Sequence, residues 1–298
     1  MSTGEEAAEE PQPITPLPPR AIEKTPMFTA MNAARYQRQT LIRDIETEQP
    51  RLLCYVAGNK AQVDRIDTLG FVDMLHNIKP RDPIDLLLHT PGGDIDAAEK
   101  LIGLVRSVTG EEGQLRVIVP DYAKSAGTLM ALGANSIVMS DSSELGPIDP
   151  QVSSKDGNGS DAVYSVLTYL NAYDAARKEL RDAPDDLAAR ITFEKFDPTI
   201  VRKLQSVRDR ARSFAENLLK RRGKNFSKIA SELMDINKYQ SHGQMIGWET
   251  ADEMGLTIEY MPSTQVVWRK YWALYCHLRL AIESEQRIFE SNYVSMIL

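Results

Sequence analysis

Four short apolar runs, alternating with segments of helical periodicity, most constrain the fold of this chain. The runs cover residues 51–57, 83–89, 115–120 and 136–140. Between them, residues 61–77 and 97–108 carry apolar side chains three or four positions apart, which is the spacing of one helix face. Strands alternating with helices predict parallel β-α-β units, and strands without polar alternation predict a sheet covered on both faces. The sequence therefore predicts an α/β fold.

The rest of the chain has a different texture. Residues 1–26 are acidic and rich in proline, which predicts a flexible arm. Residues 27–264 form the predicted main domain, and helical periodicity from about 160 to 235 predicts a helical insert within it. The C-terminal extension, residues 265–298, is predicted to be helical, with one long helix from 265 to 290.

Composition excludes several function classes. The 298 residues carry a net charge of −7, which argues against nucleic acid as the main partner because phosphate binding needs concentrated Lys and Arg. Two cysteines without a CxxC pair and four histidines offer little for a zinc site, and we expect no metal and no cofactor. The chain shows no secretory signal pattern and no apolar run of about 18 residues. We therefore expect a cytoplasmic protein without a membrane span.

A glycine-rich turn follows the second apolar run, in the sequence HTPGGDID of residues 89–96. Pro91 fixes one backbone angle, while Gly92 and Gly93 permit tight or left-handed backbone. The amide hydrogens of such a turn can hold a developing oxyanion, although a phosphate site or a plain strand-to-helix turn fits the same residues. The spacing is not that of GxGxxG, so it does not favour nucleotide binding. His89 is expected to be a packed structural residue.

Ser125 stands at the start of a short apolar helix, in the sequence KSAGT. A serine there can simply cap the helix. It can also be a nucleophile at a strand-to-helix turn, with the amide of Ala126 as an oxyanion donor. A third segment, GPIDP, holds Asp149 rigidly between two prolines, where turn capping is its plain role.

Together, the TPGGD, KSAGT and GPIDP segments resemble the ClpP-class peptidases, and above all the serine dehydrogenase proteinase family, a relative of signal peptide peptidase A. The resemblance is strong over residues 50–155 and looser over 238–260. It implies a ClpP/crotonase-like spiral of ββα units with a helical insert and a C-terminal helix, assembled as a homo-oligomer. It also implies peptide hydrolysis with Ser125 as the nucleophile, and an oxyanion hole made by Gly92 or Gly93 together with Ala126.

The proton acceptor stays open. ClpP has a histidine in the segment that reads GPIDP here, and an aspartate in a later segment; in this chain Asp149 takes the first place and His242 lies near the second. A triad of Ser125, His242 and Asp149 would keep the chemistry, because triads are defined by geometry. Relatives of signal peptide peptidase A use a lysine instead, and Lys155 is the alternative base. Lys124 should point away from its neighbour Ser125.

We therefore expect a serine endopeptidase acting on peptides or proteins through an acyl-enzyme on Ser125. A crotonase-like acyl-CoA enzyme is one alternative, since it would share the glycine turn without needing the serine. A catalytically inactive assembly or adaptor protein is another, with the helical segments as partner surfaces. Because the chain has no Walker motif, any unfoldase or adaptor would be a separate chain.

Overall fold

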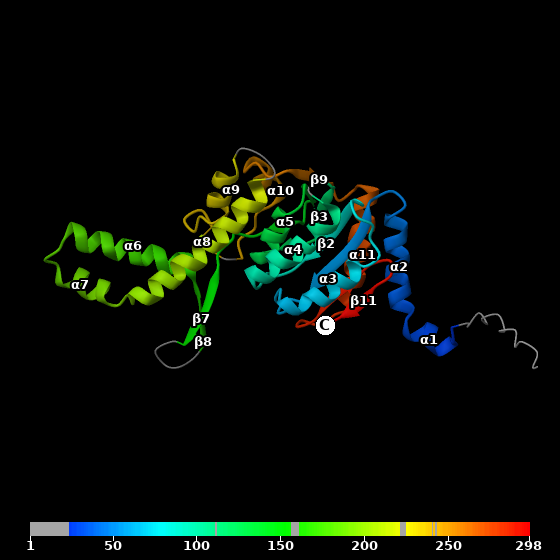
Figure 1. The fold of residues 1–298 in the computed structure, drawn as a ribbon, viewed down its shortest axis with the longest axis horizontal. Helices are drawn as coiled ribbons and strands as arrows, with labels where there is room; N and C mark the ends of the chain where they lie inside the picture. Colours follow the sequence, from blue (N-terminus) through cyan, green and yellow to red (C-terminus); the bar gives the residue numbers. More distant parts are fainter. Residues whose placement is uncertain (1–23, 111, 156–160, 221–224, 240, 242) are drawn as a thin grey trace, which may run out of the picture.

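The computed structural model describes residues 24–110, 112–155, 161–220, 225–239, 241 and 243–298 (Figure 1). The predicted flexible arm, residues 1–26, lies almost wholly outside this part of the chain. Its last residue, Pro26, begins the short helix α1 (Pro26–Met31).

A seven-stranded sheet forms the centre of the fold, with strand order β11-β10-β1-β2-β3-β5-β9. Its parallel strands are β1 (Arg51–Ala57), β2 (Ile84–His89), β3 (Leu115–Ile118), β5 (Ser136–Met139) and β9 (Ile258–Tyr260). All four apolar runs of the sequence contribute a strand to it. The predicted α/β class is therefore confirmed.

Helices cover both faces of the sheet. Alternate residues of β1 point to opposite sides: Leu53 and Tyr55 belong to a larger core, whereas Leu52 and Cys54 belong to a smaller one. The larger core is completed by α3 (Thr68–Leu75), which follows the short 3-10 helix η1 (Arg65–Asp67), and by α4 (Ile95–Thr109), α5 (Ala126–Leu132) and α10 (Trp248–Glu253). The smaller core is completed by α2 (Ala33–Ile45) and α11 (Val266–Leu280).

The C-terminal segment departs from its prediction as one long helix over 265–290. Helix α11 ends at Leu280, and the chain returns as two antiparallel strands, β10 (Arg287–Glu290) and β11 (Ser295–Ile297). Strand β10 pairs with β1, so Phe289 enters the larger core and Ile288 the smaller one. Pairing with the exposed edge of β1 overrides the helical spacing of these apolar residues. The division of the chain into domains stays a prediction.

The predicted helical insert is present. A hairpin of β7 (Gln151–Lys155) and β8 (Asp161–Ser165) leads into α6 (Val166–Asp182), α7 (Leu187–Glu194), α8 (Pro198–Lys220) and α9 (Phe226–Leu233). The first part of α8 packs through Val201 and Leu204 onto α6 in a separate cluster. Its second part, with Ala211 and Phe214, joins the larger core. Figure 1 shows α6 and α7 projecting away from the sheet while α8 returns to it.

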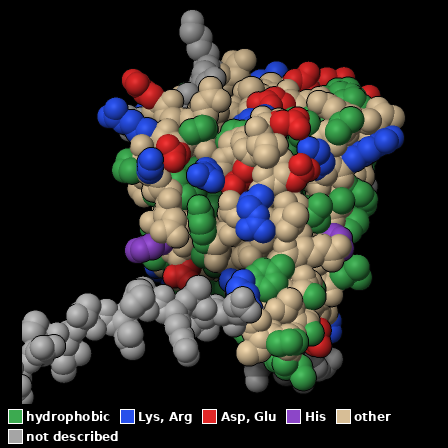
Figure 2. Space-filling model, turned by 90° about the vertical axis from the view of Figure 1, so that its right-hand side faces the viewer, with side chains coloured by type: hydrophobic (Ala, Val, Ile, Leu, Met, Phe, Trp, Pro, Cys, Tyr) green, Lys and Arg blue, Asp and Glu red, His purple; other side chains and the backbone are tan. Residues whose placement is uncertain are grey.

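The face of the molecule at the α2 end carries both positive and negative side chains. Figure 2 shows Lys and Arg side chains scattered among Asp and Glu side chains over the face at the α2 end of the molecule. Every helix within the described ranges is too short or too polar to cross a lipid bilayer.

Candidate active site

The glycine turn lies between the end of β2 and the start of α4. Gly92 has φ +104° and Gly93 has φ +149°, conformations that side chains with a Cβ rarely adopt. Backbone hydrogen bonds pin the turn to Val63, whose amide donates to the Gly92 carbonyl at 2.8 Å and whose carbonyl accepts from the Asp94 amide at 2.9 Å. A Cβ at Gly93 would lie 2.4 Å from the Val63 nitrogen. Glycine is thus required here by close backbone approach.

The serine turn lies between two short elements. Strand β4 (Tyr122–Ala123) pairs with β6 (Glu144–Leu145), and α5 begins at Ala126. Ser125 has φ +51° and ψ −114°, and a non-glycine residue with positive φ stores backbone strain. All residues of α5 are buried, so this helix holds the strained turn in place. Ser125 itself is half-buried.

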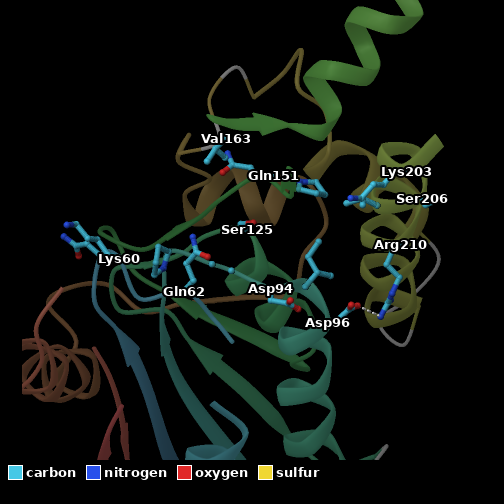
Figure 3. Close-up of a pocket in the computed structure, with 17 residues that line it drawn as sticks. Lys60, Gln62, Asp94, Asp96, Ser125, Gln151, Val163, Lys203, Ser206 and Arg210 are labelled. Carbon is cyan, nitrogen blue, oxygen red and sulfur yellow. Dashed lines mark hydrogen bonds and ion pairs between the residues drawn. The ribbon is translucent and has the colours of Figure 1, made fainter. Parts of the chain in front are cut away.

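The two turns meet. A Cβ placed on Gly92 would lie 2.8 Å from the Cβ of Ser125 and 3.3 Å from the amide nitrogen of Ala126. Ser125 and both glycines line the same cavity, which has a volume of about 870 Å³. Figure 3 shows Ser125 at this cavity, among side chains that come from both the sheet side and the insert. The serine therefore stands at an accessible cleft, beside the glycine turn.

The amides around Ser125 differ in their partners. The Gly92 amide donates to the Oγ1 atom of Thr90 at 3.1 Å. Among the described residues, the amides of Gly93 and Ala126 donate no hydrogen bond. Gly93 lines the cleft and the Ala126 nitrogen lies beside Gly92, so these two N–H groups are the candidate donors to an acceptor next to Ser125.

Helix α8 supplies one wall of the cleft, through Lys203, Ser206 and Arg210. Arg210 forms ion pairs with Asp96, at 3.1 Å, and with Glu99 on α4 (Figure 3 draws the contact with Asp96). Sequence reasoning did not identify these side chains. Their spacing of three, four and seven positions was the available signal, because it places them on one helix face.

Lys124 precedes Ser125 but is engaged elsewhere. Its ammonium forms an ion pair with Glu144 and donates to the carbonyl of Leu145 at 3.2 Å. It also donates to the carbonyls of Gly243 and Gln244, at 3.3 and 3.4 Å. This buried lysine thus ties Gly243 and Gln244 to the serine turn.

The base candidates remain predictions. His242 lies outside the described residues, and so does the side chain of Lys155, whose backbone belongs to β7. Asp149 is buried and accepts a hydrogen bond from the Ser165 hydroxyl at 2.7 Å. Ser165 is also the N-cap of α6, because its hydroxyl accepts from the Thr168 amide. Asp149 is therefore attached to the start of the helical insert.

His89 is structural, as predicted. It is fully buried, and its Nδ1 atom lies 3.2 Å from the hydroxyl of Tyr275. Burial lowers the pKa of His89 to about 3, and the positive charge of Arg279 contributes to the shift. The imidazole is therefore neutral at ordinary pH. Within the described part of the chain, no group of three or more His, Cys, Asp and Glu side chains could hold a metal ion.

Part of the chain, including this site, is similar to known proteins. Residues 71–181 match the family model described as ClpP-like SDH-type serine proteinase. An uncharacterized protein of Methanocaldococcus jannaschii is 30% identical over 182 residues, which are 60% of this chain and 55% of that protein. A second uncharacterized protein of that organism is 36% identical over 97 residues, which are 32% of this chain and 29% of that protein. The chain thus spans about half the length of the first relative and under a third of the second.

Two solved structures of variants of the 1510-N membrane-bound stomatin-specific protease are distantly similar. One is 17% identical with a TM-score of 0.44, covering 73% of this chain and 83% of that chain. The other, in complex with a substrate peptide, is 15% identical with a TM-score of 0.38, covering 77% and 99%. The segment matched by the family model includes both the glycine turn and the serine turn. Over residues 71–181, this chain is thus similar to the ClpP-like SDH-type serine proteinases.

Proposed function

We propose that the chain is a serine endopeptidase with Ser125 as its nucleophile. The observation that carries the proposal is the close approach of the two turns, with Gly92 in contact with Ser125 at the wall of an open cleft. Ser125 and Gly93 line that cleft, and the Ala126 amide follows Ser125 directly at the start of α5. This is the arrangement that acyl transfer needs.

In the proposed reaction, the Ser125 oxygen attacks a peptide carbonyl as its proton passes to a base. The carbonyl oxygen becomes an oxyanion that accepts hydrogen bonds from Gly93 and Ala126, and loss of such a donor typically costs about 3–4 kcal/mol of transition-state stabilisation. The base then gives this proton to the amine as the peptide C–N bond breaks. The acyl group stays on Ser125 as an ester, the acyl-enzyme. Water, deprotonated by the same base, hydrolyses this ester and restores the hydroxyl.

His242 is the proposed base, with Asp149 orienting it and Lys155 as the alternative. In its support, the neighbouring carbonyl of Gly243 lies against Lys124, one residue from Ser125. A desolvated Lys155 would act by losing its charge on burial. Both assignments keep the nucleophile and the oxyanion donors unchanged.

The cleft between α4 and α8 is the proposed binding site for the peptide substrate. Because α8 forms one wall, the helical insert would restrict how a chain enters. We extend the proposal to a homo-oligomer, which the family resemblance implies. It also includes a cytoplasmic location and a separate unfoldase or adaptor, which we expect from the sequence.

Labelling by a fluorophosphonate probe tests the proposal. We expect the wild-type protein to be labelled at Ser125 and the Ser125→Ala variant to show no labelling. Ser206→Ala is the matched control, because Ser206 lines the same cleft on α8 and should not react. Thioester turnover that survives Ser125→Ala would instead support an acyl-CoA enzyme. A folded protein that neither reacts with the probe nor cleaves any peptide of a library would support the adaptor alternative.

A further inference from the structure

Thr90 lies between the glycine turn and the serine turn and is fully buried. We propose that Thr90 is a positioning residue for the oxyanion site: its hydroxyl holds the Gly92 amide away from the cleft, so that the Gly93 amide is left to bind the oxyanion. This inference rests on the proposed peptidase function. It concerns a residue that never touches the substrate and acts through the two turns.

The hydroxyl of Thr90 contacts the glycine turn. Its Oγ1 atom accepts the hydrogen bond of the Gly92 amide at 3.1 Å. The next amide along the chain, that of Gly93, donates no hydrogen bond to any of the described residues. The hydroxyl thus accepts the hydrogen bond of the Gly92 amide, and the Gly93 amide remains available to bind an oxyanion.

The methyl group of Thr90 contacts the serine helix. A Cβ built on Gly127 would lie 2.5 Å from the Cγ2 atom of Thr90. The methyl therefore fills the space beside Gly127, two residues after the nucleophile. Only glycine at position 127 leaves room for it.

The backbone of Thr90 holds the strand that leads to Ser125. Its amide donates to the Tyr122 carbonyl at 3.1 Å, and its carbonyl accepts from the Lys124 amide at 3.0 Å. One residue therefore touches both turns through three different groups: the hydroxyl, the methyl and the peptide.

A glycine turn needs such an anchor. Glycine has the most permissive backbone, whereas an oxyanion donor acts only within about 2.7–3.1 Å of the developing charge. Val63 fixes the turn from its outer side, through the Gly92 carbonyl and the Asp94 amide. The Thr90 hydroxyl adds a further anchor by accepting from the Gly92 amide.

Two substitutions separate the hydroxyl from the methyl. Thr90→Val keeps the shape and removes the acceptor, so we expect kcat for peptide cleavage to fall about 10- to 100-fold with KM within about twofold, a smaller loss than deletion of an oxyanion donor. Thr90→Ser keeps the acceptor and removes the methyl. We expect its kcat to stay within about threefold of wild type while its melting temperature falls, because the contact with Gly127 is lost.

Thr90→Ala provides a second test of the hydroxyl in case Thr90→Val does not fold. Thr90→Ser and Thr90→Ala both lack the methyl and differ only in the hydroxyl. We therefore expect kcat of Thr90→Ala to be lower than kcat of Thr90→Ser by the same factor by which Thr90→Val falls below wild type. Wild-type kcat in Thr90→Val or Thr90→Ala would overturn the proposal. So would a serine variant as impaired in kcat as the alanine variant, because packing alone would then explain the effect.

Amide hydrogen exchange provides a readout that needs no activity. We expect the Gly92 amide to be protected in wild type and Thr90→Ser, and to exchange faster in Thr90→Ala. Equal protection in all three proteins would overturn the proposal. If wild type cleaves no peptide and takes up no fluorophosphonate, the proposed function fails on its own, and the exchange experiment still decides whether Thr90 holds the glycine turn.

Discussion

Gly92 and Ser125 lie in direct contact, so that a Cβ on the glycine would be 2.8 Å from the Cβ of the serine. The two residues are 33 positions apart and belong to separate turns, one after β2 and the other after β4. Each has positive φ, which glycine adopts readily but serine adopts only with backbone strain.

Gly92→Ala should disable the site and destabilise the fold. The new methyl would lie 2.8 Å from both the Lys124 carbonyl oxygen and the Ser125 Cβ, and alanine disfavours positive φ. We expect a loss of about 2–4 kcal/mol in the free energy of unfolding and no probe labelling. Gly103→Ala on α4 is the control: a Cβ there meets nothing within 4 Å, so stability should rise by up to about 1 kcal/mol. Denaturant unfolding of both variants measures this, and a labelled, fully stable Gly92→Ala would contradict the geometry.

Arg210→Gln should weaken peptide binding with little effect on stability. Its ion pairs with Asp96 and Glu99 join the two walls of the cleft, but they are partly exposed and contribute at most about 1 kcal/mol. We expect KM for a peptide that spans the cleft to rise a few-fold. Arg212→Gln is the control, because Arg212 pairs with Glu216 within α8. Equal changes of KM in both variants would show that α8 does not act through this contact.

Substitution of the three candidate residues should identify the base. We expect His242→Ala and Asp149→Asn each to lower kcat by about 10³-fold or more, while Lys155→Met stays close to wild type. Ser165→Ala serves as the control for Asp149, since it removes the 2.7 Å hydrogen bond and the cap of α6 at a cost of about 1 kcal/mol in stability. Steady-state kinetics decides, and loss of activity in Lys155→Met alone would assign the lysine.

Acid should destabilise the fold partly through His89. Burial lowers its pKa to about 3, from the value of 6.5 expected in the unfolded chain. Between these values the unfolded chain binds a proton that the folded chain does not, so the contribution is complete above pH 6.5 and is lost as the pH falls toward 3. The slope is at most about 1.4 kcal/mol per pH unit. Unfolding measured across this range should depend less on pH in His89→Gln than in wild type, and His76→Gln, at an exposed residue, should match wild type.

The strands and the two turns could be read from local sequence. The apolar runs became β1, β2, β3 and β5, because a strand buried on both faces needs apolar residues throughout. The glycine pair indicated an unusual backbone, and Gly92 and Gly93 both have positive φ. The prediction of one helix over 265–290 was wrong at its C-terminal end. The apolar residues near 288 fit a helix and a strand equally well by spacing, and pairing of β10 with β1 selected the strand.

The cleft could not be predicted from local sequence patterns. Arg210 contacts Asp96 across 114 positions of sequence, and Asp149 reaches the cap of α6. Such contacts depend on how α8 folds back over α4, and the pattern of one helix does not specify which surface it will meet.

The order of residues alone determined that this chain forms a layered α/β sheet and that Ser125 and the glycine pair each lie between a strand and a helix. Side-chain periodicity and backbone preference are local properties, so a single sequence displays them. Tertiary packing decided that Gly92 contacts Ser125, that Thr90 occupies one amide of the glycine turn, and that α8 walls the cleft. These relationships exist only when distant segments pack together, because the free energy that sets them comes from burial and hydrogen bonding between those segments.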